Sequence, residues 1–234
     1  HGIPRSEVIG LGALSTSALW MNTNNPAIKS LKDFTPKDKI ALPGVKTSLS
    51  AVVLQMAVAK EFGIKNYARL DPITVGLPHP DALAALTSGK TEITAHFTSP
   101  PFSYQELEDP KISRVFSSTQ ILGNITLDVV FALKQFADKN PKLIKAFMEA
   151  QDQANAYIAK DKTGAAETFL RISKIKMPQA EVEKILADPD TRFSTTPNGM
   201  MEYADFMSRA GTIKNKPAKW SDLFVSGLAG QKGS

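Results

Sequence analysis

Short hydrophobic runs, each broken by turn-forming residues, fill the first 133 positions of the chain. Runs of this length that end at glycine, proline or clustered polar residues are typical of β-strands. Stretches rich in Ala, Val and Leu, which favour helix, separate several of them. This alternation predicts an α/β fold with a parallel or mixed sheet and helices on its faces. The predicted strands are residues 7–14, 18–22, 40–42, 72–75, 92–97, 112–116 and 121–133, the last as one long extended run.

The pattern becomes helical after residue 136. Leu143, Phe147 and Tyr157 recur at helical spacing after Asn140-Pro141, a pair that favours a helix start. One short strand, residues 192–195, interrupts the helical region. The predicted helices are the run that follows Ser50 and ends near Gly63, residues 82–87 with Asp81 as their cap, and residues 104–107, 141–160, 163–172, 178–187 and 200–210.

The composition excludes several kinds of chemistry. The 234 residues include no cysteine, which removes disulfides, thiolate metal sites and cysteine nucleophiles. The net charge is +5, but the lysines are scattered among acidic residues, so we expect no nucleic-acid partner. The three histidines have no metal-ligand spacing, and no nucleotide-binding or nucleophile motif is present. We therefore expect no metal site and no cofactor, and enzyme activity has no motif to support it.

One segment, residues 39–60, combines a strand, a glycine turn and a hydroxyl-rich helix start. The first N–H groups of a helix lack partners, and the helix dipole places partial positive charge there. Thr47, Ser48 and Ser50 could therefore help to bind an anion at this helix start. The alternative is ordinary N-capping without a ligand, which a single hydroxyl would accomplish.

Two further loops of this kind follow predicted strands, at residues 76–81 and 96–102. Ligands of open α/β sheets bind where strand ends lead into helix starts. His96, Thr98 and Ser99 are therefore candidate ligand contacts. His96 alternates with core residues along its strand, so the alternative is that it faces solvent. His79, between two prolines, fits an exposed loop residue.

The order of three segments resembles a known family. They are NPAIKSLKDF…KIALPGVKTS, DALAALTSGKTEITAHFTSPPF and VVFALKQFADKNPKLIKAFMEA, and together they cover most of the chain. In order and spacing they resemble the solute-binding proteins of bacterial ABC importers. The resemblance is to the group that binds nitrate, sulfonates, taurine and thiamine-pyrimidine precursors.

This resemblance implies a two-lobed type II periplasmic-binding-protein fold, in which two α/β lobes close over a ligand. Residues 1–22 and 129–234 would form a discontinuous first lobe, and residues 31–122 a continuous second lobe. The chain would cross between them near residues 22–30 and 123–129. Ser15 and Thr16 would then follow the first strand of the discontinuous lobe and face the ligand. Asn124 would lie at the second crossing, as a further contact or as a partner for backbone groups.

The function that the resemblance implies is a solute-binding receptor of an ABC importer. Its ligand would be a small anionic or heteroaromatic solute of the sulfonate, nitrate, carboxylate or pyrimidine type. The expected partners are this ligand and the membrane permease of the importer. We expect a monomer that is exported to the periplasm.

Two rival functions use the same scaffold. The first is an enzyme like the fungal thiamine-pyrimidine synthases, but those use a cysteine-rich iron motif that this chain lacks. The second is the ligand-sensing domain of a transcription regulator, which needs a helix-turn-helix segment that does not precede Glu7. In the resembled family, the discontinuous lobe also begins with βα units that precede the segment matching residues 7–22. We therefore expect a natural protein that is longer at its N-terminus, and apolar surface on this lobe that its own small sheet cannot cover.

Overall fold

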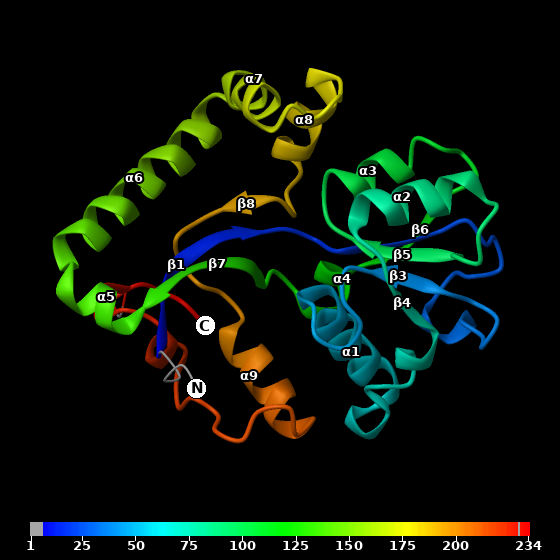
Figure 1. The fold of residues 1–234 in the computed structure, drawn as a ribbon, viewed down its shortest axis with the longest axis horizontal. Coiled ribbons are helices and arrows are strands. Elements are labelled where there is room, and N and C mark those ends of the chain that lie inside the picture. The colour runs from blue at the N-terminus through cyan, green and yellow to red at the C-terminus, as the bar shows by residue number, and fades with distance from the viewer. Residues whose placement is uncertain (1–6, 229) are drawn as a thin grey trace, which may run out of the picture. The chain divides into compact units, whose positions relative to one another are not determined.

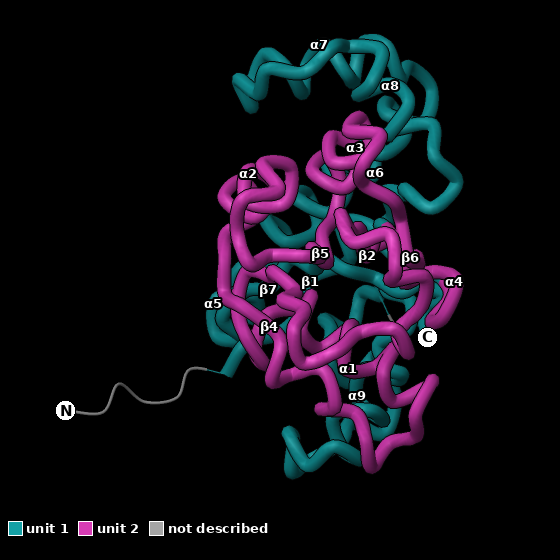
Figure 2. The backbone as a smooth tube through the Cα atoms, turned by 90° about the vertical axis from the view of Figure 1, so that its right-hand side faces the viewer, with its two compact units in different colours: residues 1–17, 124–234 teal, residues 18–123 magenta. Residues whose placement is uncertain are grey.

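The computed structural model describes residues 7–228 and 230–234, which form two compact units (Figure 2). Unit 1 combines His1–Ser17 with Asn124–Ser234, and unit 2 is Ala18–Gly123. The chain therefore passes between the units twice, after Ser17 and after Gly123. A discontinuous unit and a continuous one are the arrangement that the family resemblance implies.

Unit 2 is built on a mixed five-stranded sheet with the strand order β4-β3-β5-β2-β6. Parallel pairing joins β3 to β4 and to β5, and antiparallel pairing joins β2 to β5 and to β6. Ile40, Ala41 and Leu42 are completely buried, which is typical of a strand covered on both faces. The bounds are β2 (Trp20–Thr23), β3 (Ile40–Leu42), β4 (Thr74–Gly76), β5 (Ala95–Thr98) and β6 (Ser113–Ser117).

Helices cover both faces of this sheet (Figure 1). Helix α1 (Leu49–Phe62) lies on one face, and α2 (His79–Ser88) and α3 (Phe102–Glu106) lie on the other. A short helix, α4 (Ser118–Leu122), follows β6. The core between these layers contains the fully buried side chains of Leu54, Phe97 and Met21. Burial on both faces gives unit 2 a continuous hydrophobic core.

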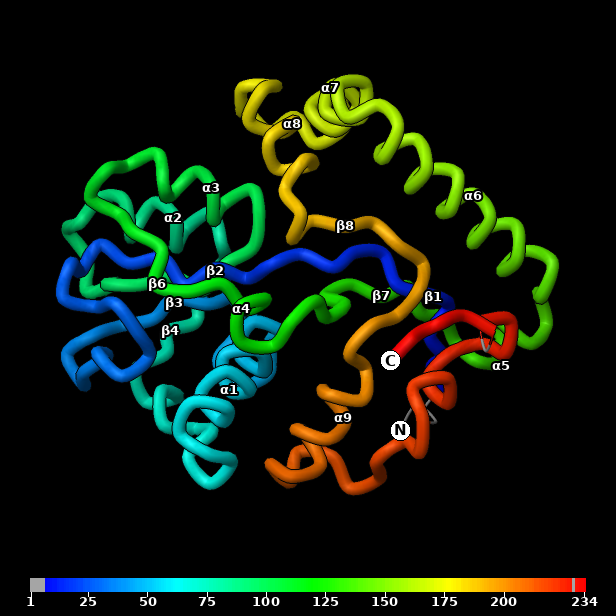
Figure 3. The backbone as a smooth tube through the Cα atoms, turned by 180° about the vertical axis from the view of Figure 1, so that it is seen from behind, coloured from blue at the N-terminus to red at the C-terminus, as the bar shows by residue number. Residues whose placement is uncertain are grey.

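Unit 1 has a smaller, antiparallel sheet of three strands with the order β7-β1-β8. The long pair joins β1 (Val8–Thr16) to β7 (Thr126–Leu133), from Val8 opposite Leu133 to Thr16 opposite Thr126. In Figure 3, α6 and α9 lie on opposite sides of this pair. The remaining elements are α5 (Lys134–Lys139), α6 (Pro141–Lys160), α7 (Lys162–Ser173), α8 (Gln179–Ala187), β8 (Arg192–Phe193) and α9 (Met200–Arg209).

Unit 1 exposes many large apolar side chains. Phe131 on β7 is 65% exposed, Leu143 on α6 is 55% exposed, and Ile172 on α7 is 68% exposed. Phe147 and Tyr157, on the predicted apolar face of α6, are also exposed. The sequence predicts this result, because three strands are too few to cover the apolar faces of the helices that follow them.

The first crossing lies earlier than the sequence predicts. Residues 18–22 were expected in the discontinuous lobe, but β2 pairs with β5 and β6 inside unit 2. All four residues of β2 are buried there. The unit boundary therefore follows Ser17 rather than falling at residues 22–30, because β2 completes the sheet of unit 2.

Two local predictions are wrong. The expected extended run of residues 121–133 begins only at Thr126, because a capping box at Ser117 starts α4 and Gly123, at φ 74°, ends it. Asp81 does not cap α2, which already begins at His79 after Pro78. A proline in the first turn favours this earlier start, and Asp81 then lies in the first turn, where a carboxylate is favourable.

The core of unit 2 can be tested with a matched pair of leucines on α1. Leu54 is 1% exposed and Leu49 is 37% exposed. We expect Leu54→Ala to lower the free energy of unfolding by about 2–5 kcal/mol, because it leaves a cavity among fixed neighbours. Leu49→Ala should change it by less than about 1 kcal/mol. Urea unfolding followed by circular dichroism measures both, and equal losses would contradict the packing described here.

Candidate functional site

The candidate site lies at one edge of the unit 2 sheet, where β3, β4 and β5 have their carboxyl ends. Because these strands are parallel, the loops that follow them leave from the same edge. A Cβ added at Gly76, the end of β4, would lie 3.7 Å from Cγ2 of Val45 in the loop after β3. His79, after β4, lies 3.1 Å from the hydroxyl of Thr98 at the end of β5, measured from its Nδ1. The three loops therefore meet, as the sequence predicts.

At the start of α1, the hydroxyls have different roles. Ser48 is the N-cap, and its Oγ accepts a hydrogen bond from the backbone N–H of Ala51 at 3.2 Å. Ser50 is buried within the first turn of the helix, and Thr47 is exposed. Lys46 is also exposed and has a positive φ of 66°. The capping alternative thus holds for Ser48, while Thr47 and Lys46 remain accessible at a helix start that favours anions.

His96 lies at the centre of the sheet and is completely buried, which contradicts the alternative that it faces solvent. Both faces of β5 are covered, one by α1 and the other by α2. The Nδ1 of His96 lies 2.5 Å from Oε1 of Glu106, which is also completely buried. The other carboxyl oxygen of Glu106 accepts a hydrogen bond from Asn22 Nδ2 at 2.8 Å. A buried carboxyl needs such partners on both oxygens.

His79 connects this buried pair to the edge of the sheet. Its Nδ1 lies 2.8 Å from Nε2 of His96, and its ring stacks on Phe102, with the centroids 5.5 Å apart. The side chain is half-buried. Burial, and secondly the electrostatic influence of the neighbouring His96, lower the pKa of His79 to about 4. His79 is therefore neutral at neutral pH.

The remaining predicted site residues do not join this network. Ser99 is half-buried next to Thr98, and its backbone carbonyl accepts a hydrogen bond from the N–H of Ser103. Three others belong to unit 1. Ser15 donates a hydrogen bond to Asp128 at 2.8 Å, Thr16 is buried in β1, and Asn124 is exposed directly after Gly123.

Two aromatic residues of unit 2 differ in their surroundings. Phe102 stacks on His79. Trp20 is buried, with the guanidinium of Arg114 4.4 Å above its ring and the ring of Tyr104 4.4 Å away. Trp20 therefore has its packing partners within unit 2.

Sequence reasoning missed Asn22 and Glu106, and undervalued His79. Alternation along β5 could not locate His96, because a central strand is buried on both faces and alternation then carries no information. A histidine inside a doubly covered strand requires a buried polar partner.

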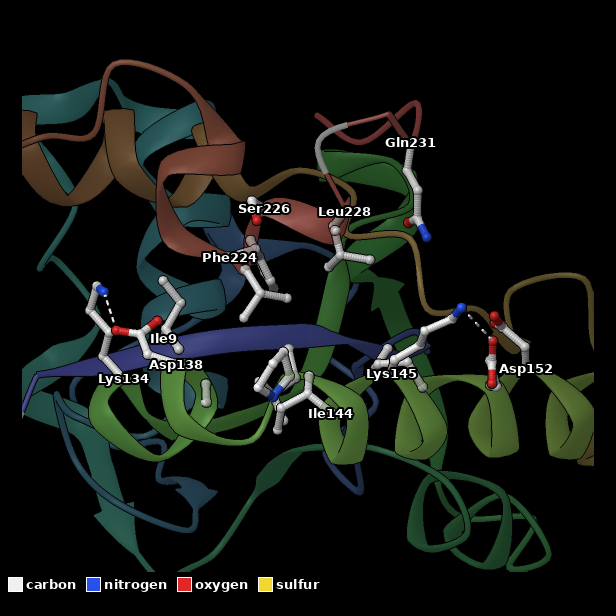
Figure 4. A pocket seen from close by; sticks show the side chains of 17 residues that line it. Ile9, Lys134, Asp138, Ile144, Lys145, Asp152, Phe224, Ser226, Leu228 and Gln231 are labelled. Atoms are coloured by element: carbon white, nitrogen blue, oxygen red, sulfur yellow. Dashed lines mark hydrogen bonds and ion pairs between the residues drawn. The ribbon is translucent and has the colours of Figure 1, made fainter.

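A cavity of about 840 Å³ lies in unit 1 (Figure 4). Its apolar lining includes Ile9 on β1 and Ile144 on α6. At its rim, Lys134 forms an ion pair with Asp138 at 2.7 Å, and Lys145 forms one with Glu149 at 3.7 Å. These four charges already have partners, so this cavity offers less polar recognition than the unit 2 network.

No helix in residues 7–228 or 230–234 is long and apolar enough to cross a membrane. The same residues contain no group of three or more His, Cys, Asp or Glu side chains that could hold a metal ion. His79, His96 and Glu106 form a hydrogen-bonded chain instead.

The capping role of Ser48 predicts a defined loss of stability. We expect Ser48→Ala to lower the free energy of unfolding by about 1 kcal/mol, because the N–H of Ala51 loses its acceptor. Ser48→Asn, which keeps a capping oxygen, should lose much less. Urea unfolding at neutral pH measures both variants. An unchanged Ser48→Ala midpoint would show that the cap contributes nothing.

The lowered pKa of His79 predicts a pH dependence of stability. Between its unfolded value of 6.5 and its folded value of about 4, the unfolded chain binds more protons at this residue than the folded chain. The contribution of His79 is therefore complete above pH 6.5 and is lost as the pH falls towards 4. We expect the urea midpoint to fall less between pH 7 and pH 4.5 in His79→Gln than in the wild type. An identical fall in both proteins would refute the assignment.

Three solved structures with a similar fold are bacterial binding proteins. The periplasmic aliphatic sulphonate binding protein SsuA from Escherichia coli matches with a TM-score of 0.68 and 19% identity, over 94% of this chain and 75% of that one. The alkanesulfonate-binding protein SsuA from Xanthomonas axonopodis, bound to MOPS, matches with a TM-score of 0.70 and 17% identity, over 91% and 72%. The periplasmic nitrate-binding protein NrtA from Synechocystis matches with a TM-score of 0.65 and 14% identity, over 92% and 63%.

These similarities confirm the predicted fold class, a periplasmic-binding-protein fold with two α/β units. No curated protein sequence matches the chain at a significant level. The family model described as NMT1/THI5 like matches residues 1–165, which is more than half of the 234 residues. The chain therefore belongs to the NMT1/THI5-like family.

Proposed function

We propose that this protein is a solute-binding receptor that captures a small anionic or heteroaromatic molecule. The candidate solutes are sulfonates, nitrate, carboxylates and pyrimidines. The observation that carries the proposal is the network at the carboxyl-end edge of the unit 2 sheet, where Thr98 and His79 lie together over the buried His96–Glu106 pair. Family membership and the binding proteins of similar fold support it.

The site offers complementary chemistry for such a solute. Lys46 and Thr47, both exposed at the start of α1, supply positive charge and donors for an acidic group. Phe102 and His79 supply flat faces against which a planar group can stack. His79 also supplies a ring nitrogen for a hydrogen bond. These features select by shape and hydrogen bonding, as binding sites do.

We further propose that the protein binds without chemical turnover. The described network contains histidines and a carboxyl group but no activated Ser nucleophile beside them, and the chain has no Cys. The solute would then be delivered to the membrane permease of an ABC importer from the periplasm. The structures of similar fold include periplasmic and ABC-type binding proteins, which supports this location and partner.

The site predicts a specific loss of affinity. The solute would first be identified by mass spectrometry of material released from the denatured native protein. We expect Thr47→Ala to weaken binding of that solute about tenfold or more, the cost of one hydrogen bond to a charged group. Thr98→Ala should weaken it through His79, because the completely buried Thr98 hydroxyl contacts Nδ1 of that ring. Isothermal titration calorimetry measures the affinity.

Thr87→Ala is the matched control. Thr87 is exposed at the far end of α2 from His79, and its hydroxyl contacts only helix carbonyls among the described residues. Its affinity should equal that of the wild type. Unchanged affinity in both site variants would move the site elsewhere, and recovery of a chemically altered solute after incubation would establish an enzyme.

A further inference from the structure

Three ionisable side chains of unit 2 form one hydrogen-bonded chain from the core to the edge of the sheet. Glu106 on α3 contacts His96 Nδ1 at 2.5 Å, and His96 Nε2 contacts His79 Nδ1 at 2.8 Å. Glu106 and His96 are completely buried, whereas His79 is half-buried. Each imidazole uses one nitrogen towards the core and the other outward, so the protons in this chain are interdependent.

The partners of Glu106 determine where these protons lie. As a carboxylate, Glu106 can only accept hydrogen bonds, so the Nδ1 of His96 must carry a proton. A neutral His96 then has a bare Nε2, which must accept from the Nδ1–H of His79. A neutral His79 with its proton on Nδ1 has a bare Nε2. The buried carboxylate therefore makes the outer nitrogen of His79 a hydrogen-bond acceptor.

The surroundings of His79 hold the ring in this orientation. Thr98 Oγ1 lies 3.1 Å from the same Nδ1, so the Nδ1–H is shared between His96 and this hydroxyl. The stacking contact with Phe102 restricts rotation of the ring. Among the described residues, no hydrogen bond to His79 Nε2 is present. That nitrogen is therefore available to a solute.

We propose that at neutral pH His79 presents an acceptor nitrogen, so that the captured solute is one that donates an N–H or O–H group to it. This inference rests on the proposed function, because it assigns the ligand class of the same site. It narrows the candidates to solutes that combine such a donor with an acidic or heteroaromatic group. Ions without a hydrogen to donate, such as nitrate and sulfate, are excluded from His79 unless a proton enters the chain.

One added proton reverses the direction of the hydrogen bond between His96 and His79. His96 then carries protons on both nitrogens and donates to Glu106 and to His79 Nδ1, which moves the proton of His79 to Nε2. The outer nitrogen becomes a donor, and the net charge of the three groups changes from −1 to 0. This form places a charged imidazole at the completely buried His96, where an ion is costly. The ionisable group in contact with His79 is His96 on β5, and Glu106 on α3 lies behind it.

Nitrogen-15 NMR of the full chain with labelled histidine tests this arrangement without a ligand. The chain has only three histidines, so His79→Gln and His96→Gln suffice to assign the signals. At pH 7.5 we expect both His79 and His96 as Nδ1–H tautomers. An Nε2–H tautomer of His79 at this pH would overturn the proposal.

Glu106→Gln provides a sharper test. Asn22 Nδ2 donates to Ser103 O at 2.9 Å as well as to Glu106, so its orientation is held. The oxygen of the new glutamine must therefore face Asn22, and its NH₂ must face His96. Both histidines should then change to the Nε2–H tautomer, whereas Glu108→Gln, at an exposed acid two residues along, should change neither. Unchanged tautomers in a folded Glu106→Gln variant would overturn the proposal. If this variant does not fold, the tautomer of His79 measured in the wild-type protein decides the question.

Calorimetry with sodium sulfate and sodium nitrate tests the ligand class. At pH 7.5 we expect that these ions either do not bind or bind with the uptake of about one proton. Repeating the titration in buffers of different ionisation enthalpy measures the number of protons taken up. Binding of either ion without proton uptake would overturn the inference. The proposed function fails separately, if Thr98→Ala and Thr47→Ala leave the affinity for the recovered solute unchanged.

Discussion

Glu106 on α3 has a completely buried carboxyl group, and both of its oxygens need hydrogen-bond partners. The contacts that satisfy this need constrain the packing of unit 2. The two oxygens engage His96 on β5 and Asn22 on β2, and the same asparagine also reaches the backbone of α3. Removing one partner of such a buried pair typically costs about 3–5 kcal/mol, because the other group is left uncompensated. These contacts therefore connect β5, β2 and α3, and His96 in turn is one of the residues that hold His79.

The parallel strands of the sheet determine where the loops that follow them lie at the surface. β3, β4 and β5 end at the same edge, so each following loop starts from a strand that is fixed in the core. α1 brings its free N–H groups to this edge, α2 brings His79, and α3 brings Phe102. A rigid sheet with converging loops is the usual basis for selective binding, because the loops supply chemistry and the strands supply position.

The two units differ in how well they bury their apolar residues. In unit 2, the sheet has helices on both faces and its largest apolar side chains are fully buried. In unit 1, three antiparallel strands support five helices, and Phe131, Leu143 and Ile172 are left exposed. Exposed apolar surface of this kind favours association with other surfaces. The buried polar network and the uncovered apolar surface are thus located in different units.

The sequence alone determined the local elements and their class. Apolar runs ended by Gly and Pro located β3 at Ile40–Leu42, and the Asn140-Pro141 pair located the start of α6. It also predicted that the loops after β3, β4 and β5 would meet, because parallel strands place their ends at one edge. These features depend on residues close together in the chain, which is why pattern and turn chemistry are sufficient to predict them.

Only the tertiary structure decided which strands lie in the middle and what the histidines contact. The hydrophobic pattern of residues 18–22 fits a strand in either unit. β2 lies in unit 2 because it pairs with β5 on one edge and with β6 on the other. His96 could face solvent or core by alternation, and its burial followed from the central place of β5. Asn22, His96 and Glu106 lie up to 84 positions apart in sequence and meet only after the sheet has formed. Hydrogen bonds between such distant side chains leave no local pattern, since they depend on strand order rather than on neighbouring residues.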